Sequence, residues 1–441
     1  MREFRGTGYL RLWVGQSLSG LGDTIFETTL VVWIATELAA GRSWSALAVS
    51  AVFVASAVPI LLVGPVAGAL IDRWRDKRGV ALRANAVSAL LILALLPAAG
   101  IVRLPGTTGD LPLGVRLGAV FTIVLLASAA AQFLRPSVSI LYRDVLPEAL
   151  WARAAGMSQF SYGLTALVGP SLAAPLLFSF GPGWALAINA ASFGVAFLLT
   201  RSVTVPDVDP GPAVAGAGSG VWTDVAEGLR FFRRTPVLTT IAVSIVIAVS
   251  GLGAINALDV FFVTTNLNTP ARYYGLLASA NGAGVVIGSL AWGYAAGRVG
   301  EARLLWGGMF GLGAATLVYA NLTSLAPGLA VSFALGFIAA AVNIAIAPMV
   351  QRVTPREFLG RVGATLNPIV AGSSLIGQVG GGVLYSTVLR DLDVEAFGVS
   401  FGPLDTLFMM VGILCIAAGL FAASRLRDLE IPDRIPEGIG P

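Results

Sequence analysis

The chain has 441 residues, of which 56% are hydrophobic and only 12% are charged. Soluble domains are about a quarter charged, and disordered chains combine low hydrophobicity with high net charge. The composition therefore excludes both classes. The sequence has no His and a single Cys, Cys415. This excludes His-based metal sites, His general bases and any disulfide within the chain.

Apolar runs long enough to cross a bilayer recur along the chain. A helix needs roughly 20 apolar residues to span the hydrocarbon layer, and only helices or closed barrels satisfy their backbone there. The short alternating segments of barrel strands are absent. We therefore expect an all-α polytopic membrane protein with twelve transmembrane helices, at 12–38, 45–71, 80–100, 116–141, 155–180, 184–201, 237–265, 274–297, 303–323, 329–351, 362–389 and 404–424.

The basic residues are distributed unequally over the loops between these predicted helices. Cytoplasmic loops carry an excess of Lys and Arg. If both termini are cytoplasmic, nearly all of the 28 basic residues lie on the inner side. The outer side then holds only Arg42, Arg103, Arg116, Arg272 and Arg390. The pattern predicts that both termini are cytoplasmic.

The longest break between predicted helices lies in the middle of the chain. It begins with the Pro- and Gly-rich stretch PDVDPGPAVAGAGSG, which is typical of a flexible linker. Trp222, Val225, Leu229 and Phe232 then fall on one helical face, which predicts an amphipathic helix in the cytoplasmic headgroup layer. We expect a six-helix bundle at 1–202, a cytoplasmic linker at 203–236, a second six-helix bundle at 237–424 and a cytoplasmic tail at 425–441.

The two predicted bundles share short motifs at equivalent places. Ser-Gly-Leu-Gly occurs in the first helix of each bundle, at 19–22 and at 250–253. A Pro and an Arg follow the fourth helix of each bundle with the same spacing, at 147–153 and at 355–361. Parallel repeats of this kind indicate a two-bundle transporter.

Four stretches resemble one known family. They are LRLWVGQSLSGLGD at 10–23, GALIDRWRDKR at 68–78, EGLRFFRRTP at 227–236 and QRVTPREFLGRV at 351–362. Over essentially its whole length the chain resembles the major facilitator superfamily, in the branch of enterobactin-type siderophore exporters and macrolide-efflux proteins. The resemblance implies alternating access between two six-helix bundles, and it favours efflux from a bacterial cell.

Three acidic residues are predicted to lie well inside the membrane: Asp23, Glu27 and Asp259. A charge at the bilayer centre costs about 2.5–3.5 kcal/mol. Asp23 and Glu27 share one helix face, and two like charges in a low dielectric disfavour the state in which both are ionised. We interpret the three acids as proton-coupling residues. The alternative is a structural role, in which they pair with an Arg or face water.

Arg135 follows in the inner part of the predicted helix at 116–141. It is a candidate charge partner for a carboxylate of the first helix. Alternatively, its long side chain reaches the cytoplasmic interface and carries no further role.

A cytoplasmic gate is the second predicted site. A carboxylate beside a helix end, together with Arg donors, can hold two bundles together when the inner face is closed. The alternative is that the basic residues only orient the chain in the membrane. The candidate gating residues are Gly68, Asp72, Arg73, Arg78 and Arg361.

Polar and aromatic residues inside the predicted helices are candidates for a substrate cavity, although helix packing and lipid contact use the same residue types. They are Phe26, Trp33, Tyr162, Asn281, Asn343 and Asn367. No Gly-rich stretch follows a strand or precedes GK[ST], so a nucleotide site is not expected.

These features favour a secondary active transporter in the cell membrane, a proton-coupled antiporter that exports a small amphipathic molecule such as a drug, antibiotic or siderophore. Multidrug resistance is then the expected phenotype. An uptake permease on the same fold is the alternative, and a membrane enzyme or a non-transporting scaffold is disfavoured. We expect a monomer that is not an enzyme and has no cofactor, metal or nucleic-acid partner. The sequence identifies neither the substrate nor the direction of transport.

Overall fold

The structure is a computed structural model that describes residues 7–74, 76–102, 111–147, 150–205, 230, 235–354, 359–390, 392, 394–396 and 399–426. Within these ranges, the side chains of 65, 69, 72, 73, 152, 155, 159, 347, 359–361, 363–365, 367, 394–396 and 399–401 are not described. The predicted amphipathic helix after the central linker and the predicted tail from 427 lie outside the described residues.

The chain divides into two units. The first contains residues 1–213 and 270–279, and the second contains 214–269 and 280–441. The sequence placed 270–279 in the second bundle. The contacts group this segment with the first unit, because the short 3₁₀ turn η4 (Ala271–Tyr273) packs against α5 (Trp151–Phe180).

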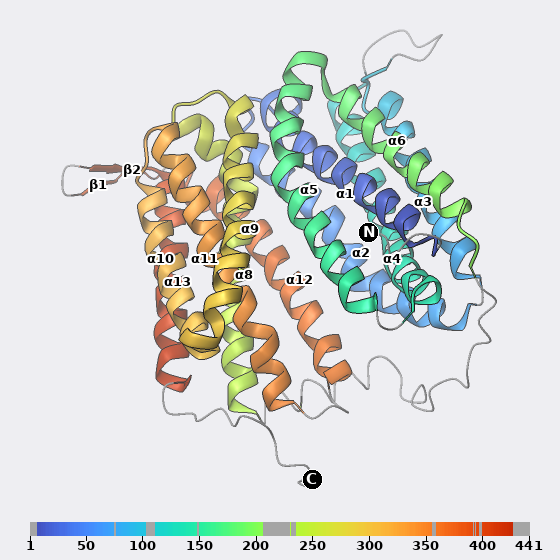
Figure 1. Cartoon of the computed structure of the whole chain (residues 1–441). Coiled ribbons are helices and arrows are strands. Elements are labelled where there is room, and N and C mark those ends of the chain that lie inside the picture. The colour runs from blue at the N-terminus through green and yellow to red at the C-terminus, as the bar shows by residue number, and fades with distance from the viewer. Residues whose placement is uncertain are drawn as a thin grey trace. The chain divides into compact units, whose positions relative to one another are not determined.

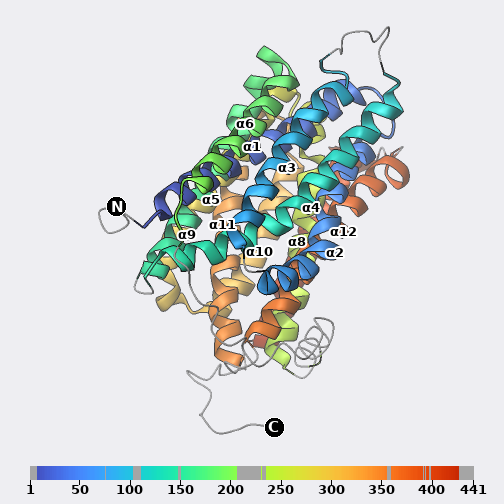
Figure 2. The same ribbon diagram turned by 90° about the vertical axis from the view of Figure 1, so that its right-hand side faces the viewer.

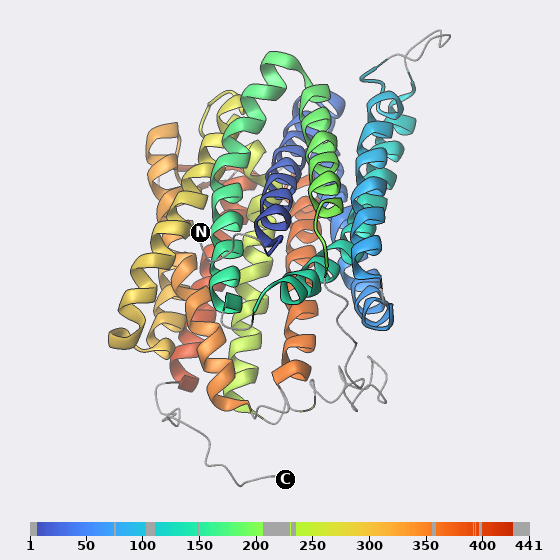
Figure 3. The same ribbon diagram turned by 45° about the vertical axis from the view of Figure 1, so that its right-hand side comes forward.

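Helix α1 is the centre of the first unit (Figures 1 and 3). It lies against α5 and α6, while α4 packs against α2 and α3, which run beside it in Figure 2. Ile25, Ala173 and Ala185 form a buried core between α1, α5 and α6. The elements are α1 (Tyr9–Trp33), its π-helical continuation η2 (Ile34–Leu38), α2 (Ser45–Arg73), α3 (Lys77–Ala98), α4 (Leu113–Val145), α5 and α6 (Pro182–Arg201).

The second unit repeats this packing plan. Helix α8 lies against α12 and α13, as α1 lies against α5 and α6, and α10 packs against α11 and α13, as α3 packs against α4 and α6. The elements are α8 (Pro236–Thr265), α9 (Tyr274–Val299), α10 (Glu301–Ala320), α11 (Leu325–Val353), α12 (Leu359–Val383), the π-helical turn η6 (Leu384–Val388) and α13 (Pro403–Leu426). Helix α9 begins in the segment that groups with the first unit.

The repeated Ser-Gly-Leu-Gly motif explains part of this plan. A Cβ at Gly22 would collide with the side chains of Asn189 and Ser192 on α6. A Cβ at Gly253 would collide with the backbone of α12 at Ser374. Inside a membrane the hydrophobic effect does not drive helices together. Small residues favour packing there because they let the helices approach closely. The motif therefore holds the first helix of each unit against a neighbour.

The expected all-helical fold is confirmed, and one connection between helices also contains two short strands. A short antiparallel hairpin, β1 (Val394–Ala396) and β2 (Val399–Phe401), connects η6 to α13. Its Val and Phe residues have high β-propensity, but each strand has only 3 residues. A run this short shows no periodicity in the sequence.

Among the described residues, eleven helices are long and apolar enough to cross a membrane. Helix α10 is not one of them, and it carries Glu301 and Arg303 in its first turn. Observed helix ends lie close to the predicted ones: the first helical segment, predicted at 12–38, runs from Tyr9 to Leu38.

Candidate functional site

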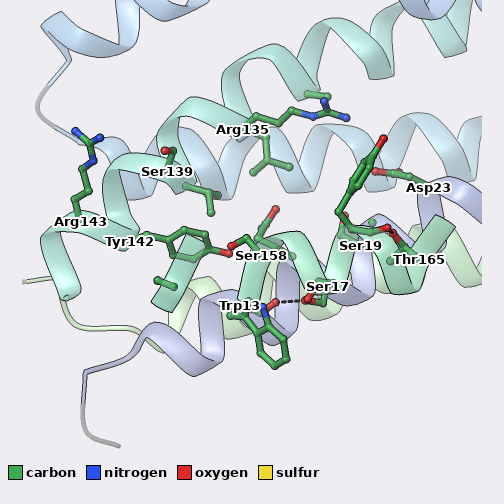
Figure 4. A pocket seen from close by; sticks show the side chains of 18 of the residues that line it. Trp13, Ser17, Ser19, Asp23, Arg135, Ser139, Tyr142, Arg143, Ser158 and Thr165 are labelled. Atoms are coloured by element: carbon green, nitrogen blue, oxygen red, sulfur yellow. Dashed lines mark hydrogen bonds between the residues drawn. The ribbon is translucent and has the colours of Figure 1, made fainter. Parts of the chain in front are cut away.

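A cavity of about 790 Å³ lies within the first unit. Helices α1, α4 and α5 form most of its wall, and Phe193 of α6 completes it. Figure 4 shows these helices around the cavity, with aromatic and hydroxyl side chains between them. The polar and aromatic lining residues are Trp13, Gln16, Ser17, Ser19, Asp23, Arg135, Ser139, Tyr142, Arg143, Trp151, Ser158, Ser161, Tyr162 and Thr165.

Hydrogen bonds between α1 and α5 fix one wall of this cavity. The Tyr9 hydroxyl donates to the carbonyl of Ala154 at 3.0 Å, and Trp13 Nε1 donates to the carbonyl of Met157 at 3.2 Å. One turn further on, Ser17 Oγ lies 2.8 Å from Ser161 Oγ. The donors recur every four residues and so lie on one face of α1.

Opposite charges meet at one end of the cavity. Asp23 is half-buried in the lining, and its carboxylate lies near the Asn189 side chain of α6. The positive charge of Arg135 acts on both Asp23 and Glu27. Glu27 is exposed and lies one turn beyond the lining residues. In Figure 4 the Arg135 guanidinium reaches toward the end that holds Asp23, whereas Arg143 lies at the opposite end.

Helix α4 carries the positive side of this arrangement. Arg135, Ser139 and Arg143 are spaced by four residues and share a face toward the cavity. Pro136 lies inside the helix directly after Arg135, and a Pro removes the backbone hydrogen bond to the residue four before it. Near the other end, the Arg143 guanidinium lies 5.3 Å from the centre of the Trp151 ring, within the range of a cation–π contact.

A second, smaller cavity of about 270 Å³ lies within the second unit. Among the described residues that line it, Asn343 is the one polar side chain. The others come from α8, α10, α11 and α12: Ile245, Ala248, Val249, Leu252, Leu312, Ala339, Val342, Ile346, Leu366 and Val370.

The two cavities occupy matching positions in the repeat. The number of residues between Pro147 and Pro355 also separates matched residues of the two linings. It relates residues of α4 to residues of α11, and residues of α5 to residues of α12. The matched pairs are Ala131 with Ala339, Leu134 with Val342, Arg135 with Asn343, Val138 with Ile346, Ser158 with Leu366 and Tyr162 with Val370. The cavities therefore correspond by position and differ in chemistry.

Asp259, the third predicted acid, lies in neither lining. Its Oδ1 accepts a hydrogen bond from the Tyr319 hydroxyl of α10 at 2.7 Å. The rings of Phe262 and Phe408 pack on Tyr319, at centroid distances of 4.7 Å and 6.0 Å. Asp259 therefore belongs to a polar contact beside a buried aromatic cluster.

The predicted gating residues are only partly described. The side chains of Asp72, Arg73 and Arg361 lie outside the described part. Arg78 donates to the carbonyl of Arg201 at the end of α6, where a cation also complements the helix dipole. A Cβ added at Gly68 would meet no neighbouring atom.

The predicted cavity residues separate into two groups. Tyr162 lines the first cavity and Asn343 the second. Phe26 and Trp33 are buried in the core of the first unit, and Asn281 Nδ2 donates to the carbonyl of Ser332 at 3.2 Å across the α9–α11 contact. Trp33 Nε1 donates to Glu37 Oε2 at 3.0 Å. The side chain of Asn367 is not described.

Several lining residues were not singled out in the sequence. Trp13, Tyr142, Arg143 and Trp151 lie near predicted helix ends, where aromatic and basic residues are expected as interfacial anchors. The four-residue spacing of Arg135, Ser139 and Arg143 is the feature of the sequence that indicates a shared polar face on this helix. Within the described part of the chain, no cluster of three metal-ligating side chains occurs.

The family model of the Major Facilitator Superfamily matches residues 12–268 and 248–440. The chain belongs to this superfamily of membrane transporters, so it is a multi-pass membrane protein with a small-molecule substrate and not an enzyme.

Relatives within the superfamily are distant but cover nearly the whole chain. The MFS-type transporter YfiS of Bacillus subtilis (strain 168) is 23% identical over 95% of this chain and 94% of its own. The multidrug efflux pump Tap of Mycolicibacterium fortuitum is 23% identical over 88% of this chain and 90% of its own. Macrolide efflux protein A of Streptococcus pyogenes is 21% identical over 96% of this chain and 97% of its own.

The solved structures support the fold. The nucleoside transporter NupG aligns with a TM-score of 0.71 over 95% of this chain and 98% of its own, at 13% identity. Such a low identity establishes the architecture and carries no information about substrate.

Proposed function

We propose that the chain is a proton-coupled antiporter that exports small amphipathic molecules across the cytoplasmic membrane by alternating access. In this proposal it has twelve membrane-spanning helices, α10 included, and both ends of the chain are cytoplasmic. The observation that carries the proposal is the placement of Asp23 and Arg135 at one end of the first cavity, with Glu27 one turn beyond it and also within reach of the Arg135 charge.

The three groups suit proton exchange. A transporter needs a group that binds a proton in one state and releases it in another, and without His a carboxyl is the simplest such group. While Arg135 is close, its charge stabilises the ionised carboxylates. When Arg135 moves away, or when a substrate takes its place, repulsion between the two carboxylates disfavours the state in which both are ionised. Competition between proton and substrate then couples the two flows.

The first cavity suits a drug-sized substrate. Ligand pockets have volumes of about 300–1,000 Å³, and this cavity measures about 790 Å³. Trp13, Tyr142, Trp151 and Tyr162 offer flat apolar surfaces, and hydroxyl groups lie between them. Export is favoured because two relatives are named for multidrug and macrolide efflux.

Asp72 and Arg73, the last residues of α2, are proposed to form a cytoplasmic gate together with Arg361. Arg78 is proposed to stabilise the end of α6, since it donates a hydrogen bond to the Arg201 carbonyl.

A labelling experiment tests the topology. With Cys415→Ala as background, Trp74→Cys should resist an impermeant thiol reagent on intact cells, and Arg390→Cys should react. The reverse pattern contradicts the proposed orientation.

Transport by everted membrane vesicles tests the function. We expect vesicles that contain the protein to accumulate ethidium or a radiolabelled macrolide when their interior is acidified, and to lose it when the pH gradient is collapsed. Vesicles without the protein are the control. Accumulation only in right-side-out vesicles would support the uptake permease, and transport in neither orientation with any gradient would reject a transporter of these compounds.

A further inference from the structure

At the matched positions, each polar or charged residue of the first cavity is replaced in the second by an uncharged or apolar one. Arg135 corresponds to Asn343, Tyr162 to Val370 and Ser158 to Leu366. The repeated Ser-Gly-Leu-Gly motif places Ala254 at the position of Asp23. The second cavity therefore has the same place in the repeat and lacks the ionic groups.

This composition determines what the second cavity can hold. A charged or strongly polar group would lose its water there and find only the Asn343 amide in the described lining, which is unfavourable. An apolar group loses nothing and gains contacts with aliphatic side chains from four helices. The cavity therefore selects for uncharged hydrocarbon surface.

The volume of the second cavity further limits the ligands that it can hold. An engineered apolar cavity of about 150 Å³ binds benzene, and the second cavity measures about 270 Å³. It has room for one or two aromatic rings or a branched alkyl group of similar volume. The largest drug-sized ligands need more space than this, so the cavity suits one part of a larger molecule.

We propose that the cavity of the second unit is a subsite for an uncharged apolar group, one or two rings in size, of the transported molecule. The main lining residues are Leu252, Val342, Asn343, Ile346, Leu366 and Val370. The inference rests on the proposed export function, which supplies the molecule.

A pair of cysteine variants tests the subsite. In the Cys415→Ala background, Val370→Cys and Tyr162→Cys place a thiol at matched positions of the two cavities, where the native side chains are 38% and 74% exposed. The rate of reaction with a small maleimide is measured on purified protein with and without 1-naphthylamine, a two-ring probe that is uncharged at neutral pH. Glucose serves as the polar control compound.

We expect the naphthylamine to slow labelling at position 370 by about tenfold when its concentration is ten times the dissociation constant. Glucose should have no effect there. Labelling at position 162 should change by less than about twofold, because the charged and hydroxyl side chains of the first cavity hold water that an uncharged probe would have to displace. Equal protection at both positions would indicate general partitioning and would overturn the proposal, as would no protection at position 370.

A filling substitution provides the second measurement. Ala131 and Ala339 are matched alanines, one in each lining. Adding Ala339→Phe to the Val370→Cys protein should abolish the protection, whereas adding Ala131→Phe should leave it. Protection that survives Ala339→Phe overturns the assignment. If that variant does not fold, the comparison of positions 370 and 162 decides alone.

Ethidium transport by vesicles that contain the Cys415→Ala protein separates this inference from the proposed function. Transport without protection at position 370 rejects the subsite and keeps the exporter. Protection without transport in any orientation rejects the exporter and leaves an apolar binding site in the second unit.

Discussion

The two units share a packing plan and differ in where they place charge. In the first unit, Asp23 and Arg135 line a large cavity with aromatic and hydroxyl side chains. In the second, the matched cavity is small and its described lining is apolar except for Asn343. A duplicated architecture thus carries two kinds of surface, and a few substitutions at matched positions account for the difference.

The acids inside the membrane-spanning helices follow the same division. Asp23 faces a cavity and feels the charge of Arg135, whereas Asp259 is held by the Tyr319 hydroxyl beside an aromatic cluster. An acid that must exchange protons needs access to water or substrate, and a fixed hydrogen bond to a buried Tyr does not provide it. We therefore assign proton coupling to the first unit and a structural role to Asp259.

The strongest effect is expected where helix backbones touch. A Cβ at Gly377 of α12 would collide with the backbone of α8 at Ser250, whereas a Cβ at Gly20 of α1 would meet the Thr165 side chain at an ordinary 3.8 Å. Gly377→Ala should lower the free energy of unfolding by about 3 kcal/mol. Gly20→Ala should lower it by less than about 1 kcal/mol. Thermal unfolding in detergent measures both, and equal losses of stability would contradict the closer helix contact at Gly377 than at Gly20.

Exchanging the matched α4 and α11 residues tests the division of charge. Asn343→Arg should lower ethidium transport by about tenfold or more, because it brings an unpaired charge into an apolar lining. Arg135→Asn should lower it by a similar factor, because the cation opposite Asp23 is lost. Initial rates in everted vesicles, at matched expression, measure both. If the Arg is tolerated at position 343, the two linings are chemically interchangeable and the comparison fails.

Asp259→Asn should leave transport and its pH dependence nearly unchanged. The Asn Oδ1 can still accept the hydrogen bond from Tyr319, so the expected loss of stability is about 1 kcal/mol. Tyr319→Phe is the matched control and should cost a similar amount. Loss of uphill transport in Asp259→Asn, with normal unfolding, would move the coupling group into the second unit.

The smallest effect is expected at a pair of surface contacts with reversed charge. Arg352 near the end of α11 contacts Glu301, the first residue of α10, at 2.8 Å. At the matched place in the first unit, Asp144 of α4 feels the charge of Lys77, the first residue of α3. Glu301→Gln should cost no more than about 1 kcal/mol, since Arg352 is partly exposed. The loss should shrink in high salt, and a salt-independent loss would contradict an ionic contact.

Helix positions were readable from the sequence because each span is a long apolar run with turn residues at its ends. The placement of Asp23 and Arg135 near each other was also predictable, since isolated charges inside a membrane are costly and seek partners. Phe26 and Trp33 were less readable. Their helix is apolar on most faces, so the pattern did not separate core from cavity, and both side chains are buried.

The second cavity was the least predictable feature. Its lining is made of Leu, Val, Ile and Ala, which are also the residues of lipid-facing and packed surfaces, and only Asn343 was noted. The cavity is evident only in the structure, where α11 and α12 line it as α4 and α5 line the first cavity. The hairpin of β1 and β2 was too short to leave a pattern.

Proton coupling by the first unit is the central claim, and purified protein in liposomes tests it most directly. Uphill ethidium accumulation driven by a pH gradient is compared among Asp23→Asn, Glu27→Gln, the double variant and Asp259→Asn, with downhill ethidium exchange as the control for folding. We expect at least one single variant and the double variant to lose uphill accumulation while keeping exchange, and Asp259→Asn to keep both. Accumulation by the double variant at the normal rate, or its loss only in Asp259→Asn, would contradict the account.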